Sequence, residues 1–215
     1  TSVTVKRDGE VKRLELQRGK LGTFAGVGPE TKFTPSKGKA ELQTIRKMKK
    51  GERTGTTVRF WPDSMIFLPE AELSIRAIRH RLRQTAFLVP NLKLTLVDEK
   101  TDPDKPTTET FCYSGGIVDM VDVLSHDTKL CDTIHIQGQG MFTETVPMLN
   151  DKNEMVSTEM ERTVEVNVAL RWGNGYDTHV KSFVNIVSTP KEGTHVKGVE
   201  RALVNTLRKA FDGTR

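Results

Sequence analysis

The feature that most constrains this chain is the way its hydrophobic period changes along the sequence. Apolar residues recur at helical spacing from Glu70 to Leu88 and again from Thr194 to Phe211. Elsewhere they alternate with polar residues at the period of a strand, most clearly from Arg162 to Trp172. Strands therefore come first and are then mixed with helices, and this order predicts an α+β fold.

The first quarter of the chain predicts a hairpin, a loop and a strand. Two β-branched, alternating runs flank Asp8-Gly9, a dipeptide that accepts the positive φ angles of a tight turn. The stretch from Gly19 to Gly55 is rich in Gly, Lys, Thr and Pro, has little periodicity, and is interpreted as a long loop. A strong strand pattern follows from Thr56 to Trp61, and Pro62 ends it.

The remaining elements are shorter, and one of them is ambiguous. Gly138 to Glu161 is either a wandering insertion or an extended hairpin. Gly173-Asn174-Gly175 is interpreted as a turn from which a strand returns over His179 to Val187. Other expected elements are strands over Asn91–Val97, Thr110–Tyr113 and Thr133–Gln137, and a short helix over Ile117–Leu124.

Composition restricts the class of protein without choosing a function. Hydrophobic residues make up 35% of the 215 residues and charged residues 28%, which is typical of a globular protein. No apolar run is long enough to span a membrane and no signal peptide is visible, so a cytoplasmic protein without membrane contact is expected. The chain lacks a starting methionine, which suggests an excised segment. Its net charge of +5 permits contact with a polyanion, although the basic stretches 46–50 and 76–83 are also consistent with solvated surfaces.

No catalytic or metal motif stands out. The histidines lack metal-ligand spacing, no Walker-type loop is present, and Cys112 and Cys131 are interpreted as buried free thiols. Glu192-Gly193-Thr194-His195 lies at the start of the last predicted helix. Its amides could bind a phosphate, or Gly193 could simply turn the chain while Thr194 caps the helix.

A series of motifs, in order and over nearly the whole chain, resembles one protein family. These motifs are Arg7-Asp8-Gly9 with Arg18-Gly19, Thr54-Gly55-Thr56-Thr57-Val58-Arg59-Phe60-Trp61-Pro62-Asp63, Arg81-Leu82-Arg83-Gln84-Thr85-Ala86-Phe87-Leu88, Leu96-Val97-Asp98-Glu99, Thr110-Phe111-Cys112-Tyr113-Ser114-Gly115-Gly116-Ile117-Val118-Asp119, Ala169-Leu170-Arg171-Trp172-Gly173-Asn174-Gly175-Tyr176, Ser182-Phe183-Val184-Asn185, and Gly193-Thr194-His195 with Gly198. Together they resemble the B subunits of the bacterial type IIA DNA topoisomerases, DNA gyrase and topoisomerase IV. Two regions, Thr23 to Arg53 and Gly140 to Arg162, are longer than the family pattern.

The resemblance implies two domains and a role in energy coupling. Residues 1–63 would be the C-terminal strands of a GHKL-type ATPase domain. Residues 64–215 would be a transducer domain similar to domain 2 of ribosomal protein S5, with a left-handed β-α-β crossover that is an exception to the usual handedness. In the family, ATP closes two B subunits around a DNA duplex, and the A subunit completes an A2B2 heterotetramer.

The resemblance also implies site residues and a missing activity. Thr56 and Val58 match the wall of the family's adenine pocket, and Arg7 matches an arginine at the pocket mouth. ATP and Mg²⁺ would bind the full-length protein, and neither is expected to bind this chain alone. The general base, the magnesium ligand and the γ-phosphate lysine of the family have no counterpart in the sequence, so no hydrolysis by the isolated chain is expected. The alternative is a stand-alone nucleic-acid-binding module of S5-like fold.

Overall fold

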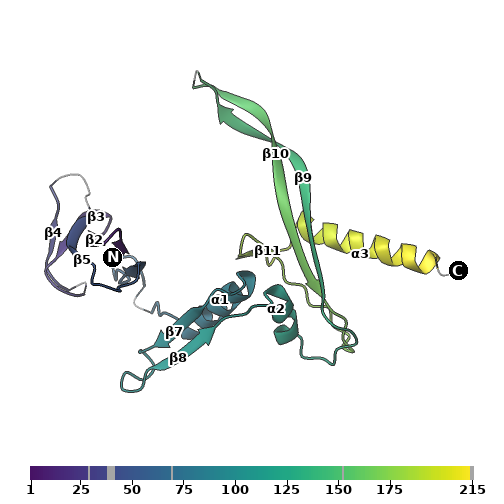
Figure 1. Ribbon diagram of the computed structural model, residues 1–215, viewed down its shortest axis with the longest axis horizontal. Coiled ribbons are helices and arrows are strands. Elements are labelled where there is room, and N and C mark those ends of the chain that lie inside the picture. The colour runs from purple at the N-terminus through teal and green to yellow at the C-terminus, as the bar shows by residue number, and fades with distance from the viewer. Residues whose placement is uncertain (29, 38–41, 69, 152, 214–215) are drawn as a thin grey trace. The chain divides into compact units, whose positions relative to one another are not determined.

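The computed structural model describes residues 1–28, 30–37, 42–68, 70–151 and 153–213, and the chain divides into two compact units (Figure 1). The first unit is Thr1–Glu72 and the second is Leu73–Arg215. Each unit has its own secondary structure, strands only in the first and strands with helices in the second. No helix among the described residues is both long and apolar enough to cross a membrane.

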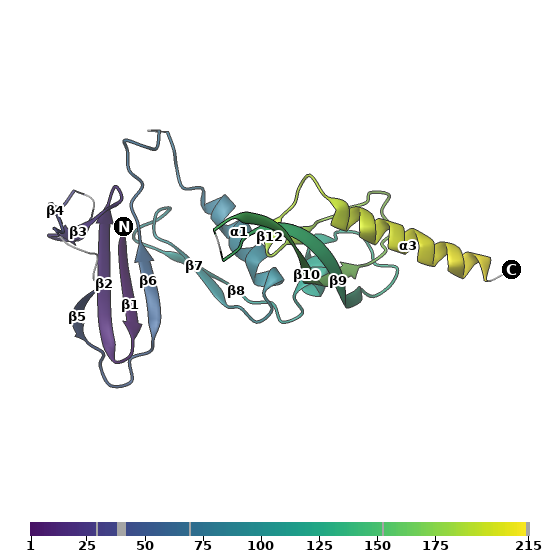
Figure 2. The same ribbon diagram turned by 90° about the horizontal axis from the view of Figure 1, so that it is seen from above.

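The first unit is a six-stranded antiparallel sheet (Figure 2). Along its main path the strand order is β4-β3-β2-β1-β6, and β5 pairs with the part of β2 that β3 leaves free. The strands are β1 (Ser2–Arg7), β2 (Glu10–Gln17), β3 (Lys20–Phe24), β4 (Phe33–Pro35), β5 (Gln43–Lys47) and β6 (Gly55–Arg59). The predicted hairpin is confirmed, because Asp8 and Gly9 adopt φ angles of 53° and 76° between β1 and β2.

The prediction of a long loop from Gly19 to Gly55 is wrong. Three short strands, β3, β4 and β5, occupy much of this region. Strands of three to five residues are too short to show a clear alternation, and packing between distant residues holds them in place. The Phe24 and Phe33 rings lie 4.9 Å apart, and Phe24 also makes an edge contact with Trp61 at 6.2 Å. Residues 29 and 38–41 of this region lie outside the described residues.

The second unit mixes helices and antiparallel strand pairs. Its elements are α1 (Ile75–Leu88), β7 (Leu94–Asp98), β8 (Thr107–Phe111), α2 (Ile117–Leu124), β9 (Ile134–Leu149), β10 (Met155–Leu170), β11 (Phe183–Val184), β12 (Val187–Ser188) and α3 (Thr194–Asp212). Its buried side chains are Ala86, Phe87, Phe111, Met120, Asp98 and Val196. Phe87 stacks on Tyr113 with ring centroids 3.8 Å apart, so α1 packs against the end of β8.

Helix boundaries follow from local capping. Helix α1 begins five residues later than Glu70, because the Ser74 hydroxyl accepts a hydrogen bond from the amide of Ala77 at 3.3 Å. Helix α2 has the predicted boundaries. Helix α3 begins at Thr194 as predicted, but its N-cap is Gly193 and no side chain makes a capping hydrogen bond. The interpretation of Thr194 as a cap is therefore wrong.

The region after Gly138 is an extended hairpin, not a wandering insertion. Strands β9 and β10 pair over sixteen residues each, from Ile134↔Leu170 to Leu149↔Met155 (Figure 1). The return strand predicted over 179–187 is wrong, because only the two-residue strands β11 and β12 form there. The residues after β10 pair instead with the loop before β9, through a bridge between Lys129 and Gly173.

The two cysteines are free, as predicted, but the prediction that both are buried is wrong. Cys112 is exposed and Cys131 is half-buried. Cys112 lies one residue beyond the end of β8, where the chain turns toward α2.

Candidate functional site

Neighbouring strands bring two of the three predicted binding residues together. Strand β6 pairs with β1 in a register that places Thr56 opposite Val5 and Gly55 opposite Lys6. Arg7 ends β1 at the same point of the sheet. An open hollow forms there, lined by Val5, Lys6, Arg7, Asp8, Thr54, Gly55 and Thr56. Two segments nearly fifty residues apart thus form one small surface, which is what a binding edge requires.

Val58 lies on the same strand but outside this hollow. It pairs with Val3, two residues beyond Thr56, and is 60% exposed. Because side chains two apart on a strand point to the same face, Val58 extends the Thr56 surface with apolar area. Arg7 and Thr56 are therefore brought together, and Val58 lies next to them.

The charges around the hollow are mainly basic. Lys6 forms an ion pair with Glu52 at 2.9 Å, and Arg46 binds the same carboxylate at 2.8 Å. Hydrogen bonds from Arg46, Lys6 and the Lys49 amide hold the pKa of Glu52 well below its usual range. Arg7 makes only a long contact of 3.5 Å with Asp8, and its side chain is 79% exposed. Arg7 is thus the cation best placed to bind an anionic group.

The hollow has binding chemistry but no machinery for hydrolysis. Asp8 is the one acidic residue among those that line it, and its side chain is 87% exposed. Among the described residues there is no group of three or more His, Cys, Asp or Glu side chains that could hold a metal ion. Phosphoryl transfer depends on positioned groups that orient water and on metal ions that neutralise charge. The surface can contact a nucleotide, and it lacks the means to cleave one.

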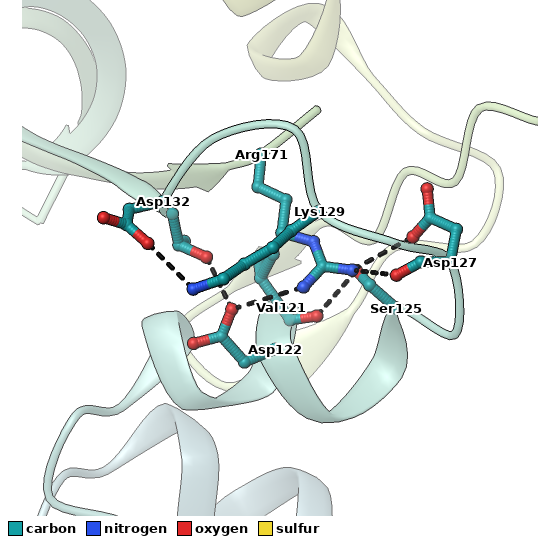
Figure 3. Close-up of polar contacts among 8 residues, drawn as sticks. Val121, Asp122, Ser125, Asp127, Lys129, Asp132 and Arg171 are labelled. Carbon is teal, nitrogen blue, oxygen red and sulfur yellow. Dashed lines mark hydrogen bonds and ion pairs between the residues drawn. The ribbon is translucent and has the colours of Figure 1, made fainter. Parts of the chain in front are cut away.

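A second polar cluster joins α2 to the end of β10 (Figure 3). The Arg171 side chain is only 8% exposed, and its guanidinium binds the Asp127 carboxylate at 3.0 Å and the Asp127 carbonyl at 3.1 Å. It also approaches Asp122 of α2 at 3.7 Å. Lys129 and Asp132 pair at 2.8 Å beside it. Hydrogen bonding to Arg171 lowers the pKa of Asp127 from its ordinary value.

Backbone contacts extend this cluster into a junction between two loops. Leu130 donates to the Trp172 carbonyl at 2.9 Å, and Asn174 donates to the Thr128 carbonyl at 3.0 Å. Gly173 has no room for a side chain, because an added Cβ would overlap the Asp127 carboxylate. The sequence signalled only a turn at Gly173-Asn174-Gly175. Its contact with residues some 45 positions away has no local signature.

The arginines of α1 divide into two groups. Arg79 binds Glu109 of β8 through its Nε at 2.7 and 2.9 Å, and Arg83 lies over the Phe111 ring at 5.7 Å. These two arginines fasten the helix to its own unit. Within the described residues, Arg76 and Arg81 have no acidic partner, so only they remain to meet an external anion.

The start of α3 favours a packing role for Gly193. The His195 ring approaches Gly193 so closely that an added Cβ would lie 2.9 Å from it. His195 also contacts the Thr189 hydroxyl at 3.3 Å, and Thr189 contacts Ser182 at 2.6 Å. Glycine at position 193 therefore admits the imidazole of its neighbour, and the helix start is occupied by its own side chains.

Comparisons with known proteins agree with one another. The family model for DNA gyrase B matches residues 116–215. Curated relatives include the DNA gyrase B protein of Thermotoga maritima, which is 33% identical over 96% of this chain and 27% of the relative. The DNA gyrase B protein of Bacillus mycoides is 32% identical over 95% of this chain and 40% of the relative. The chain belongs to the DNA gyrase B family. The resemblance found in the sequence motifs is thereby confirmed.

Solved structures of gyrase B share the fold. The 43K ATPase domain of Thermus thermophilus gyrase B, solved in complex with an aminocoumarin, aligns with a TM-score of 0.66 at 24% identity. The alignment covers 97% of this chain and 47% of that one. The gyrase B structure from Myxococcus xanthus gives the same TM-score at 23% identity. The predicted mixture of helices and sheets, similar to gyrase B structures, is confirmed.

This gyrase B family chain is shorter than its relatives. It spans about a quarter of the length of the gyrase B proteins from Thermotoga maritima and Haloferax volcanii, 27% and 26% respectively. It is thus homologous to a part of the B subunit of a type IIA topoisomerase.

Proposed function

We propose that this chain couples ATP binding to DNA handling within the B subunit of a type IIA topoisomerase. Residues 1–63 are the end of a GHKL-type ATPase domain, and residues 64–215 are a transducer domain of S5 domain 2-like fold. The division of the structure between Glu72 and Leu73 supports two functional parts joined by a short connection. The family membership supports the assignment of each part.

The hollow between β1 and β6 is one wall of the nucleotide site. Arg7 contacts an anionic group at its mouth, while Thr56 and Val58 line the side that faces the base. The observation that carries this proposal is the meeting of Arg7 and Thr56 at one open surface, although they lie 49 positions apart in sequence.

ATP and Mg²⁺ bind the complete subunit, and the chain alone does not hydrolyse ATP. The base and the magnesium ligand come from other parts of the complete subunit. Its partners are DNA, a second copy of the same subunit and the A subunit in an A2B2 heterotetramer, and it works in the cytoplasm. Arg76 and Arg81 on α1 are the cations that support a contact with the DNA backbone, which binds charge rather than sequence.

Substitutions in the complete protein test the nucleotide wall. Arg7→Ala removes a charge-assisted hydrogen bond and is expected to weaken binding of a non-hydrolysable ATP analogue by roughly 10-fold or more. Thr56→Val keeps the side-chain shape but removes the hydroxyl, and a smaller loss is expected. Isothermal titration calorimetry with Mg²⁺ measures both. Arg13→Ala on β2 is the matched control, because Arg13 lies on the same sheet outside the hollow. Unchanged affinity in both site variants would refute the assignment.

A further inference from the structure

The outer part of the β9–β10 hairpin is a two-faced ribbon. This distal arm consists of residues 141–149 and 155–163. Its strand register pairs Phe142 with Arg162, Glu144 with Met160, Val146 with Thr158, and Met148 with Val156, and directly paired residues share a face. These eight residues form the apolar face of the arm. The opposite, acidic face carries Glu159, Glu161 and a series of threonines, with Met141, Leu149 and Met155 at its two ends.

The apolar face is exposed in the single chain. Phe142, Met148 and Val156 are 48%, 44% and 45% exposed, although large apolar side chains of a stable sheet normally lie against another layer. A lone two-stranded ribbon is only marginally stable in water, and it needs a further strand or layer over its apolar face. The arm is therefore built to be covered.

Charge decides which kind of partner fits the apolar face. Residues 141–163 contain five acidic and two basic residues, a net charge of −3 within a chain of net charge +5. The arm therefore repels DNA. On the apolar face itself the only charges are Glu144 and Arg162, which pair at 3.3 Å and are each about half exposed. This face is neutral, so it has no attraction for a strongly basic or strongly acidic segment.

A surface that is apolar, neutral and marked by one acid and one base is complementary to itself. We propose that the distal arms of two copies of this chain pack face to face through their apolar faces. A two-fold axis along the ribbon places β9 of one copy over β10 of the other, about 10 Å apart as in packed sheets. Glu144 of each copy then meets Arg162 of the other, and the contact closes as a symmetric dimer. The acidic faces point outward, so their repulsion is small.

This dimer goes beyond the proposed function, because it needs neither nucleotide nor DNA. The arm is short, so the association is weak and of the transient class. Sedimentation velocity of the 215-residue chain, without nucleotide and up to roughly millimolar concentration, is expected to show a reversible monomer–dimer equilibrium. A chain that stays monomeric over this whole range overturns the proposal.

Opposite charge changes identify the interface. Glu144→Arg makes the apolar face doubly positive, and Arg162→Glu makes it doubly negative, so each variant alone is expected to dimerise at least about 10-fold more weakly. An equal mixture of the two is expected to dimerise within about 3-fold of the unchanged chain, because the pairs re-form between copies. Loss of the Glu144–Arg162 contact within one chain cannot produce this rescue. A mixture that remains monomeric contradicts the proposal.

Two further variants separate the interface from folding. Thr158→Lys places a charge on the apolar face while leaving the Glu144–Arg162 pair intact, and it is expected to abolish association with an unchanged circular dichroism spectrum. Glu159→Lys makes a similar change on the acidic face and is expected to leave association intact. Equal effects of Thr158→Lys and Glu159→Lys overturn the assignment to the apolar face. Because no nucleotide is present, these results are independent of the nucleotide-site experiment.

Discussion

At the scale of single residues, Gly22 shows how closely β3 and β4 pack. An added Cβ would overlap the Thr34 carbonyl and the Phe33 ring, although Gly22 has an ordinary strand conformation. Gly22→Ala is therefore expected to destabilise the first unit by roughly 1–3 kcal/mol, through overpacking. Chemical denaturation followed by Trp61 fluorescence measures the change. Gly55→Ala is the matched control, because a Cβ there meets open space. Equal stability of the two variants would contradict the packing described for β3.

Single residues were predictable from sequence where their role is local. Asp8 and Gly9 carry the positive φ angles that the Asp-Gly dipeptide indicates. Arg7 and Thr56 were chosen from a family resemblance, and the pairing of β1 with β6 brings them to one hollow. Their roles in nucleotide binding stay predictions. Arg171 was not singled out, because its partners Asp127 and Asp122 are distant in sequence and a buried ion pair has no local pattern.

At the scale of elements, the Asp127–Arg171 contact joins α2 and its following loop to the end of β10. The pKa of Asp127 is lower in the folded chain than in the unfolded one, where an aspartate titrates near about 3.9. The folded state therefore gains stability from this carboxylate above that pH. The gain is lost as the pH falls through the lower pKa of the folded state.

A substitution tests this linkage. Asp127→Asn is expected to lower the midpoint of thermal unfolding at neutral pH and to reduce its dependence on pH below about 5. Thermal melts from neutral to acid pH, followed by circular dichroism, measure both effects. Asp104→Asn serves as the control, because Asp104 is an exposed loop residue that forms no ion pair among the described residues. If the two variants show the same acid dependence, the Asp127–Arg171 contact does not stabilise the junction.

Whole elements were predicted well where one period persists and poorly where it does not. Helix α2 and the hairpin β1–β2 have the predicted positions, because each is defined by its own sequence. Strands β3, β4 and β5 were missed because they are short and are held by pairing with β2 and by aromatic contacts. The return strand after Gly175 was predicted from β-branched residues that the structure leaves mostly outside strands. In that region, contacts with the loop before β9 override local propensity.

At the scale of the whole molecule, the chain exposes much more surface than its mass requires. Its accessible surface is 17,721 Å², whereas a folded monomer of 24.1 kDa exposes about 10,000 Å² and two separate domains of these sizes about 12,000 Å². The excess includes apolar side chains such as Phe60, Met65 and Phe211. This surface fits a chain whose faces are covered by other parts of a larger protein, as its span of about a quarter of its relatives indicates.

The central claim is that this chain holds only part of a nucleotide site. Isothermal titration calorimetry with a non-hydrolysable ATP analogue and Mg²⁺ tests it most directly, by comparing the 215-residue chain with a longer protein that includes the neighbouring coding sequence at both ends. The account predicts binding by the longer protein alone, because Arg7, Thr56 and Val58 form one wall without a metal ligand or base. Tight, magnesium-dependent binding by the 215-residue chain would mean that it contains a complete site, and would contradict the account.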